Sequence, residues 1–500
     1  MSQLLIGWAE VDLTQEKMIS LAGQFAERIS QYVEKPITAT AMAVEADGDQ
    51  MVMVSADLVG VSYNLMDAIR ERLADNKEGL DVTKIICAAT HIHTGPVYTR
   101  RNRTAAAGGS ISFRELLERE LPPGKKYVES ANVTNNPDIV DPNEMFDILV
   151  DRLSSVILQA WKNRAPGACT TAFGRAAVGM CRRVCYSDGS AQMWGNANTA
   201  VFTHLEGGND SGIELMYVFD GNQKLTGIIA NLACPAQCVQ HRLFVSPDFW
   251  GEVKVLLRQR FGQDLFLLAQ CSAAGDQCPV DLVRWVEPES DVNDPNLKRD
   301  NPPKRKADPS MFDLAGMRKA GKRVAREIID VYEEGLEAPA SEMEFAHTVR
   351  MMQLPLRRAT LAEAETARKA IREYIRDKEG DVDFNDAAAL QVHAGILRRM
   401  QLQEVMEVID TEVHIVRMGN TVFASNPFEL FLDYGNQIKA RSAAEQTFLI
   451  QLANGTEGYL PTEKAEKGGH YSAFISSGTV GHVGGEQLVR ETLKGIKELF

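Results

Sequence analysis

The stretch Ile85-Ile86-Cys87-Ala88-Ala89, followed by Thr90-His91-Ile92-His93-Thr94-Gly95-Pro96, decides the fold and places a candidate site in one turn. The first five residues are apolar and typical of a buried strand, which Gly95-Pro96 ends by starting a loop. Histidines at i and i+2 point to one side while the backbone stays extended, where imidazoles can hold a metal ion or move a proton. The pattern also fits two half-buried histidines at a strand end, because a metal site needs ligands from elsewhere.

The segments before this turn predict a β-α-β unit. Residues 5–13 and 37–60 read as strands, with a hairpin turn at Asp47-Gly48-Asp49. Residues 61–76 form an amphipathic helix, because apolar residues recur every four positions. Ligand sites in open α/β sheets lie at the carboxyl ends of the strands. The expected fold is therefore α/β, with a mixed, largely parallel β-sheet flanked by helices.

The rest of the chain continues this alternation of strands and helices. We expect one large domain that spans residues 1–500. Helices are expected at 143–163, 249–261 and 311–335, and through most of 359–409. Further strands are expected at 212–219, 225–232, 265–269, 412–418, 421–424 and 448–452. The segment 99–143 holds Gly, Pro, Asn and Asp runs, and 286–310 is rich in Pro, Asp and Lys; both are interpreted as insertions or loops.

Composition excludes several classes of protein. A net charge of −14 argues against nucleic acid or an anionic membrane as the main partner. No window approaches a membrane span, and the start lacks a signal peptide. Eight cysteines among 500 residues are too sparse for a disulfide scaffold. We expect a cytoplasmic protein that acts on a small molecule, and the sequence leaves a homo-oligomer open.

Three further stretches follow predicted strands. The first is Cys271-Ser272-Ala273-Ala274-Gly275-Asp276-Gln277-Cys278-Pro279, which is either a small-residue turn with a buried thiol or a backbone that approaches a ligand. The second is Asn426-Pro427-Phe428-Glu429, whose carboxylate needs a partner or metal if buried, or lies at a helix N-terminus. The third runs from Asn454 through Tyr459 to Tyr471 in Gly-rich turns. We expect one sheet edge to gather all of them.

Taken together, these motifs resemble the catalytic domain of the neutral (non-lysosomal) ceramidase family. Thr90-His91-Ile92-His93-Thr94-Gly95-Pro96 resembles its T-H-T-H-S-G-P, and Gly7-Trp8-Ala9-Glu10-Val11-Asp12-Leu13-Thr14 its G-x-A-D-I-T start. Val54-Ser55-Ala56-Asp57-Leu58 is similar to its V-S-x-D-L strand, and Gly275-Asp276-Gln277-Cys278-Pro279 to its G-D-V-S-P. The resemblance is weak at 99–143 and 286–400.

This resemblance implies zinc and a set of site residues. It implies His91, Glu429 and Tyr459 as zinc ligands and a proton-transfer or oxyanion role for His93. The remaining implied residues are Tyr471 as the second active-site tyrosine, Cys278 in place of the catalytic serine, and Arg182, in Met180-Cys181-Arg182-Arg183, as a substrate binder.

Two departures from the family matter. Its second histidine ligand precedes a proline, whereas this chain has Asn231-Leu232-Ala233-Cys234-Pro235-Ala236-Gln237. The fourth ligand is open among His204, Cys234 and His241, and we place His204 first because Asp210 could orient it. A site with three protein ligands, or one without zinc, also stays open. The chain also stops before the family's immunoglobulin-like domain and lacks an apolar lid, which favours a small polar substrate over a lipid amide.

The expected function is therefore a zinc-dependent hydrolase that uses an activated water on an amide or similar bond. Cys278 would orient the substrate or attack as a nucleophile, and the water is preferred as the attacker. Two alternatives stay open: a metal-dependent hydrolase or lyase acting on a carbohydrate, and a non-catalytic binding homologue with a degenerate site.

Overall fold

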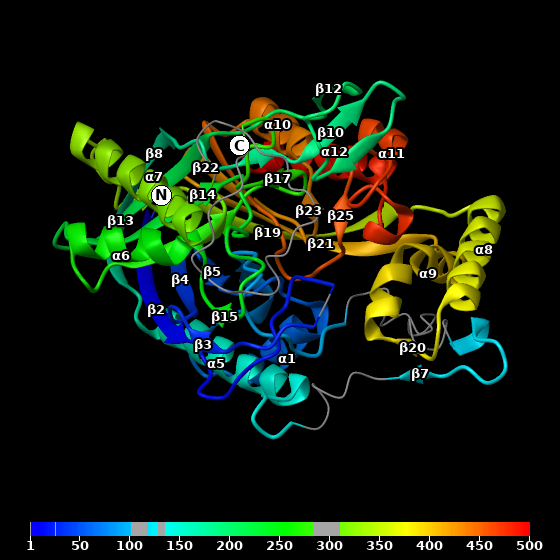
Figure 1. Ribbon diagram of the computed structural model, residues 1–500. Coiled ribbons are helices and arrows are strands. Elements are labelled where there is room, and N and C mark those ends of the chain that lie inside the picture. Colours follow the sequence, from blue (N-terminus) through cyan, green and yellow to red (C-terminus); the bar gives the residue numbers. More distant parts are fainter. Residues whose placement is uncertain (1, 26, 102–117, 129–135, 285–310) are drawn as a thin grey trace.

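The computed structural model describes residues 2–25, 27–101, 118–128, 136–284 and 311–500. Its main element is an eight-stranded sheet with the order β16-β14-β13-β8-β2-β4-β5-β6 (Figure 1). The strands are β2 (Leu5–Asp12), β4 (Thr38–Ala46), β5 (Asp49–Ala56), β6 (Ile85–Ala89), β8 (Ala165–Arg175), β13 (Gly212–Asp220), β14 (Leu225–Leu232) and β16 (Phe266–Cys271). The strands expected at 5–13, 37–60, 85–89, 212–219, 225–232 and 265–269 are confirmed, with shifts of a few residues.

The large sheet is mixed. Hairpins join β4 to β5 and β13 to β14, and β8 pairs antiparallel with both β13 and β2. The pairs β5–β6 and β14–β16 are parallel, and each is bridged by a helix, α1 (Tyr63–Leu73) or α6 (Phe249–Phe261). The predicted β-α-β unit is therefore confirmed, but the expectation of a largely parallel sheet is wrong. Hairpins reverse the chain without a crossover, so they add antiparallel pairs.

A second sheet packs against the first. It has the order β19-β21-β22-β24, formed by β19 (Phe345–Pro355), β21 (Val408–Met418), β22 (Thr421–Ser425) and β24 (Gln446–Ile450). An apolar layer that includes Met42, Met53, Val416, Phe423 and Phe448 separates the two sheets. α10 (Leu432–Arg441) and α12 (His482–Leu499) cover the outer face of the second sheet. The result is a four-layer arrangement of helices, two sheets and helices.

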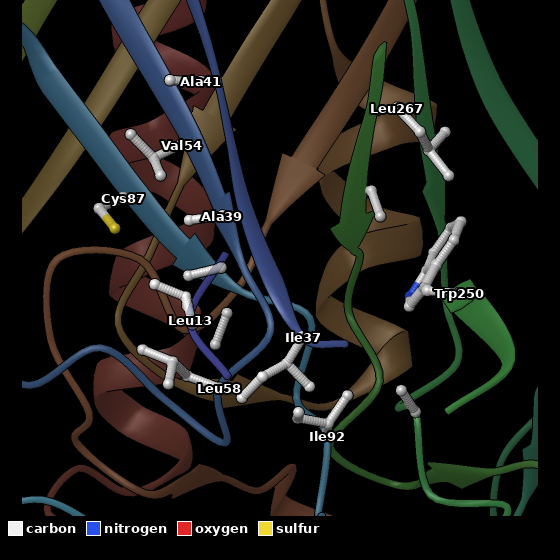
Figure 2. Packing of buried hydrophobic residues seen from close by; sticks show 14 of the residues in the cluster. Leu13, Ile37, Ala39, Ala41, Val54, Leu58, Cys87, Ile92, Trp250 and Leu267 are labelled. Carbon is white, nitrogen blue, oxygen red and sulfur yellow. The ribbon is translucent and has the colours of Figure 1, made fainter. Parts of the chain in front are cut away.

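The outer face of the large sheet is covered by α1, α6, α5 (Pro142–Lys162) and α7 (Asp313–Glu334). Figure 2 shows part of this core, where Ala41, Val54 and Cys87 lie in register on β4, β5 and β6. α5 begins after Asp141, whose carboxylate accepts a hydrogen bond from the Asn143 amide. Each fully buried Leu, Ile or Met in this layer contributes about 1.5–3 kcal/mol to folding.

A helical hairpin stands beside this body (right in Figure 1), formed by α8 (Leu361–Asp377) and α9 (Phe384–Val405). A capping box between Thr360 and Glu363 starts α8. This confirms the helical segment expected at 359–409. The insertion expected at 286–310 lies outside the described residues, as does most of 99–143. No helix in the described ranges combines the length and apolar character of a membrane span.

Short elements complete the chain. The short strands are β1 (Ser2–Gln3), β3 (Tyr32–Val33), β7 (Tyr127–Val128), β9 (Met180–Cys181), β10 (Arg183–Tyr186), β11 (Ala191–Met193), β12 (Phe202–Leu205), β15 (Phe244–Val245), β17 (Gln277–Cys278), β18 (Glu342–Met343), β20 (Val382–Asp383), β23 (Glu429–Leu430) and β25 (Tyr459–Leu460). The short helices are α11 (Glu463–Gly468), η1 (Val82–Lys84) and η3 (Ile475–Ser477). Several of these elements line the site described next.

Candidate active site

Four chain segments meet beyond the strand ends of both sheets. His91 follows β6, while the parallel pair β22 and β24 leads to β23 and β25. β23 and β25 also pair in parallel and place Glu429 opposite Tyr459. The segment after β16 joins them, because the Gly275 amide donates to the Leu430 carbonyl at 2.8 Å. We expected one sheet edge to gather these segments. The site instead lies between two sheets.

His91 is fixed at the end of β6. Its φ of 62° shows that the backbone turns here, so the extended geometry assumed for the two histidines is absent. The rings of His91 and His93 still lie close, with centroids 5.0 Å apart and planes at 82°. His91 Nδ1 donates to the Val59 carbonyl at 2.6 Å, which leaves Nε2 directed at Glu429 Oε2, 3.4 Å away.

His93 is held by a relay of buried polar groups. Arg182 Nη1 donates to Gln237 Oε1 at 3.0 Å, and Gln237 Nε2 lies 2.8 Å from His93 Nε2. Since Arg182 fixes which end of the amide is the oxygen, Gln237 donates and His93 Nε2 accepts. Burial, together with the neighbouring His91 and Arg28, lowers the pKa of His93 well below its ordinary value. His93 is thus a neutral imidazole with an acceptor nitrogen 3.5 Å from His91 Nε2.

Glu429 and the two tyrosines complete the cluster. Burial raises the pKa of Glu429, but His91 and Arg182 outweigh it and the pKa lies below its ordinary value. Arg182 Nη2 donates to Tyr459 Oη at 3.3 Å. Burial and the adjacent Glu429 raise the pKa of Tyr459 well above its ordinary value and that of Tyr471 to about 12. At neutral pH the site therefore combines one carboxylate, one guanidinium and two protonated phenols.

The other residues singled out in the sequence do not join His91 and Glu429, although His241 acts electrostatically on His93. His204 is exposed on β12, with Nδ1 3.0 Å from Thr203 Oγ1. Cys234 directs its thiol at the carbonyls of Val178 and Pro235, and burial raises its pKa well above the ordinary value. His241 packs on the ring of Phe312. Among the described residues, no three His, Cys, Asp or Glu side chains form a group that could hold a metal ion. The structure thus brings none of the three candidate fourth ligands to His91 and Glu429.

Cys278 is buried in an apolar cluster with Val184, Val280, Leu282 and Phe312. Burial raises the pKa of its thiol to about 12, and Sγ is 3.3 Å from the Val280 carbonyl. A thiol in this setting is protonated and shielded, so the geometry offers no support for a nucleophilic role.

Sequence reasoning missed two parts of the site. Gln237 ends the stretch Asn231–Gln237, in which no local pattern marks its amide as the partner of His93. Gly23 lies against the His93 ring, where an added Cβ would be 2.4 Å from Cγ, and Phe25 packs edge-on against Tyr471 with centroids 5.4 Å apart. No local pattern marks this loop, because its role depends on packing against distant residues.

A second network of buried polar side chains connects two segments of the site. Asn454 Oδ1 accepts from the Cys87 amide at 2.8 Å, and Asn454 Nδ2 donates to Glu412 Oε1 at 2.9 Å. Glu412 in turn contacts His414, whose Nδ1 lies 2.8 Å from His347 Nε2. Asn454 thereby ties the loop that carries Tyr459 to the strand that carries His91.

Comparison with known proteins identifies the fold. No family model and no curated protein matches the chain. Among solved structures, neutral ceramidase from Pseudomonas aeruginosa superposes with a TM-score of 0.66 and 15% identity, over 100% of this chain and 75% of that chain. A structure described as ceramidase complexed with C2 gives a TM-score of 0.66 and 13% identity, over 100% and 76% of the two chains. The chain therefore has a neutral ceramidase-like fold.

Proposed function

We propose that this protein is a hydrolase that cleaves an amide or similar bond of a small polar substrate at the cluster of His91, His93, Glu429, Tyr459 and Arg182. The observation that carries the proposal is the convergence of these groups, all buried except the half-buried Glu429, beyond the strand ends of two sheets. Support also comes from the fold, because the structures it resembles are ceramidases, which act on an amide. Fold likeness alone does not define a substrate, so the chemistry rests on the side chains.

The donors at the site fit a divalent cation such as zinc. Two ligands about 2.1 Å from one tetrahedral ion lie about 3.4 Å apart, the separation of His91 Nε2 and Glu429 Oε2. His91 also donates its other ring N–H to a backbone carbonyl, as metal-binding histidines do. We propose His91, Glu429 and Tyr459 as the protein ligands, with one position open. A bound zinc ion would lower the pKa of a water molecule and polarise the carbonyl of the substrate.

The remaining residues would position the reacting groups and stabilise the charge that develops on the substrate. Gln237 donates to His93 Nε2 and so holds the neutral ring beside His91, where His93 would position the neighbouring groups of the site. Arg182 is fixed by Gln237 and by the Gly275 carbonyl, so its charge is preorganised for a developing oxyanion. Tyr471 stays protonated at neutral pH and can donate a proton or hydrogen bond to the leaving group.

The test is hydrolysis of a panel of small N-acyl compounds, including N-acetyl amino acids and N-acetyl amino sugars, followed by mass spectrometry in ¹⁸O-labelled water. Wild-type protein should incorporate one labelled oxygen into the acid product. Glu429→Gln should lose at least about 100-fold in kcat/KM. Wild-type protein that releases no product from any amide, with and without added zinc, would refute the hydrolase.

Metal content is a separate measurement. Elemental analysis of purified wild-type protein should find close to one zinc per chain, and His91→Ala should lose it. Hydrolysis that persists after chelation, in protein shown to be free of metal, would reject the metal and leave the hydrolase standing.

A further inference from the structure

A cavity lies behind the Tyr459 loop, on the side of the helical hairpin. It has a volume of about 180 Å³ and lies between α9 and the segment 476–479. Its wall includes Gly458, the residue before Tyr459, and the side chains of Arg398, Arg399 and Glu457. The cavity is separate from the side chains assigned to catalysis but touches the same loop.

The cavity is positively charged within an acidic protein. Among the lining residues, Arg398 and Arg399 face one carboxylate, that of Glu457. Arg357, which acts electrostatically on Arg399, is itself offset by Glu466 and Glu363. The net charge of the whole chain is −14, so a cationic hollow is a local exception.

The two arginines of the wall differ in their partners. Arg399 is held by carbonyls, with Nη1 donating to Arg357 O at 2.6 Å and Nη2 to Gly478 O at 2.7 Å. Arg398 has no ion pair or hydrogen bond to any other described residue, and its Nε atom is buried. Burial lowers the pKa of Arg398 and lowers that of Arg399 to about 10. A half-buried guanidinium without an acceptor costs free energy that an anion would recover.

We propose that this cavity is a binding site for an oxyanion group, a carboxylate, sulfate or phosphate, and that Arg398 is its main ligand. A guanidinium binds such groups through paired N–H donors. Ser476 and Ser477 also line the cavity, and serine hydroxyls can serve as neutral donors. Drug-sized ligands occupy pockets of at least about 300 Å³, so this cavity suits one substituent or a small ion.

The position of the cavity suggests its role. An anion bound there would contact the loop that carries Tyr459, so we assign the site to an acidic substituent of the substrate. This assignment rests on the proposed function, whereas anion binding itself does not.

The test is calorimetric titration of the full chain with inorganic phosphate and with sulfate at constant ionic strength. Wild-type protein should bind one equivalent, and Arg398→Gln should weaken binding at least tenfold. Arg398→Lys, which keeps the charge and loses the planar donor pair, should lie between them. Arg376→Gln removes an exposed arginine from the same hairpin and should leave the affinity unchanged. Thermal unfolding of each variant verifies that it is folded.

Two results would overturn the site: wild-type protein that binds neither anion, or an Arg398→Gln variant that is folded and binds as tightly as wild type. Glu429→Gln should keep full phosphate affinity, so the anion site can be judged even if hydrolysis fails. Phosphate that inhibits turnover competitively supports an acidic substituent of the substrate, and non-competitive inhibition would overturn that assignment.

Discussion

Mild acid should destabilise this protein through the histidine pair behind the site. His347 Nε2 lies 2.8 Å from His414 Nδ1, and burial, together with the neighbouring His414, lowers the pKa of His347 to about 3. In the unfolded chain a histidine titrates near 6.5. Below this pH, His347 binds a proton in the unfolded chain but stays neutral in the folded chain. The contribution of His347 is therefore present above about pH 6.5 and is lost as the pH falls towards about 3.

The magnitude follows from the size of the shift. Each pH unit within this window costs about 1.4 kcal/mol, so lowering the pH from about 7 to about 5 should remove about 2 kcal/mol from the free energy of unfolding. The lowered pKa of His414, which also results chiefly from burial, acts in the same direction. Because Asn454 connects this network to the Tyr459 loop, the loop should loosen together with the fold.

The assay is urea unfolding followed by circular dichroism at about pH 7, 6 and 5, for wild type and His347→Gln. The variant loses a hydrogen bond and should be less stable at pH 7, but its stability should fall by about 2 kcal/mol less between pH 7 and 5. Every other titrating group is common to both proteins, so the difference reports His347 together with its interaction with His414. Parallel pH profiles for the two proteins would refute the reasoning.

Three further perturbations test the site. Gln237→Leu leaves Arg182 Nη1 and His93 Nε2 without their hydrogen-bond partner. Urea unfolding should show that the free energy of unfolding falls by about 3 kcal/mol. A fall of less than about 0.5 kcal/mol would contradict the hydrogen-bond chain from Arg182 to His93. Gly275→Ala places a Cβ 2.3 Å from the Glu429 carbonyl, so the unfolding free energy should fall by at least about 1–3 kcal/mol, and an unchanged midpoint would show that the backbone yields freely. The Cys278 thiol, with its pKa raised to about 12, should resist iodoacetamide in the native protein and react after denaturation. If peptide mass spectrometry finds Cys278 alkylated in the native protein, the thiol is reactive and the interpretation of Cys278 as an inert thiol is wrong.

Part of the site could be predicted because its information is local. An apolar run followed by a polar turn marks a strand end, and this placed His91 and Glu429 beside the ends of β6 and β22. The convergence of the segments was predicted at one sheet edge, whereas the structure brings them together between two sheets, because β6 and β22 belong to different sheets. The partner of His93 was not accessible, because Gln237 reaches it from 144 residues away and only the folded chain defines that contact.

The sequence by itself determined the elements of this protein and the residue types available for chemistry. The periodicity that predicted the helix at 61–76, the hairpin turn at Asp47-Gly48 and the apolar run 85–89 act over a few residues, so local sterics and burial suffice to specify them. The tertiary structure decided the mixed strand directions, the turned backbone at His91 and the exclusion of His204 from the cluster. These depend on how two sheets pack across hundreds of residues, and side-chain partners at such separations are selected by packing and burial, which no local pattern encodes.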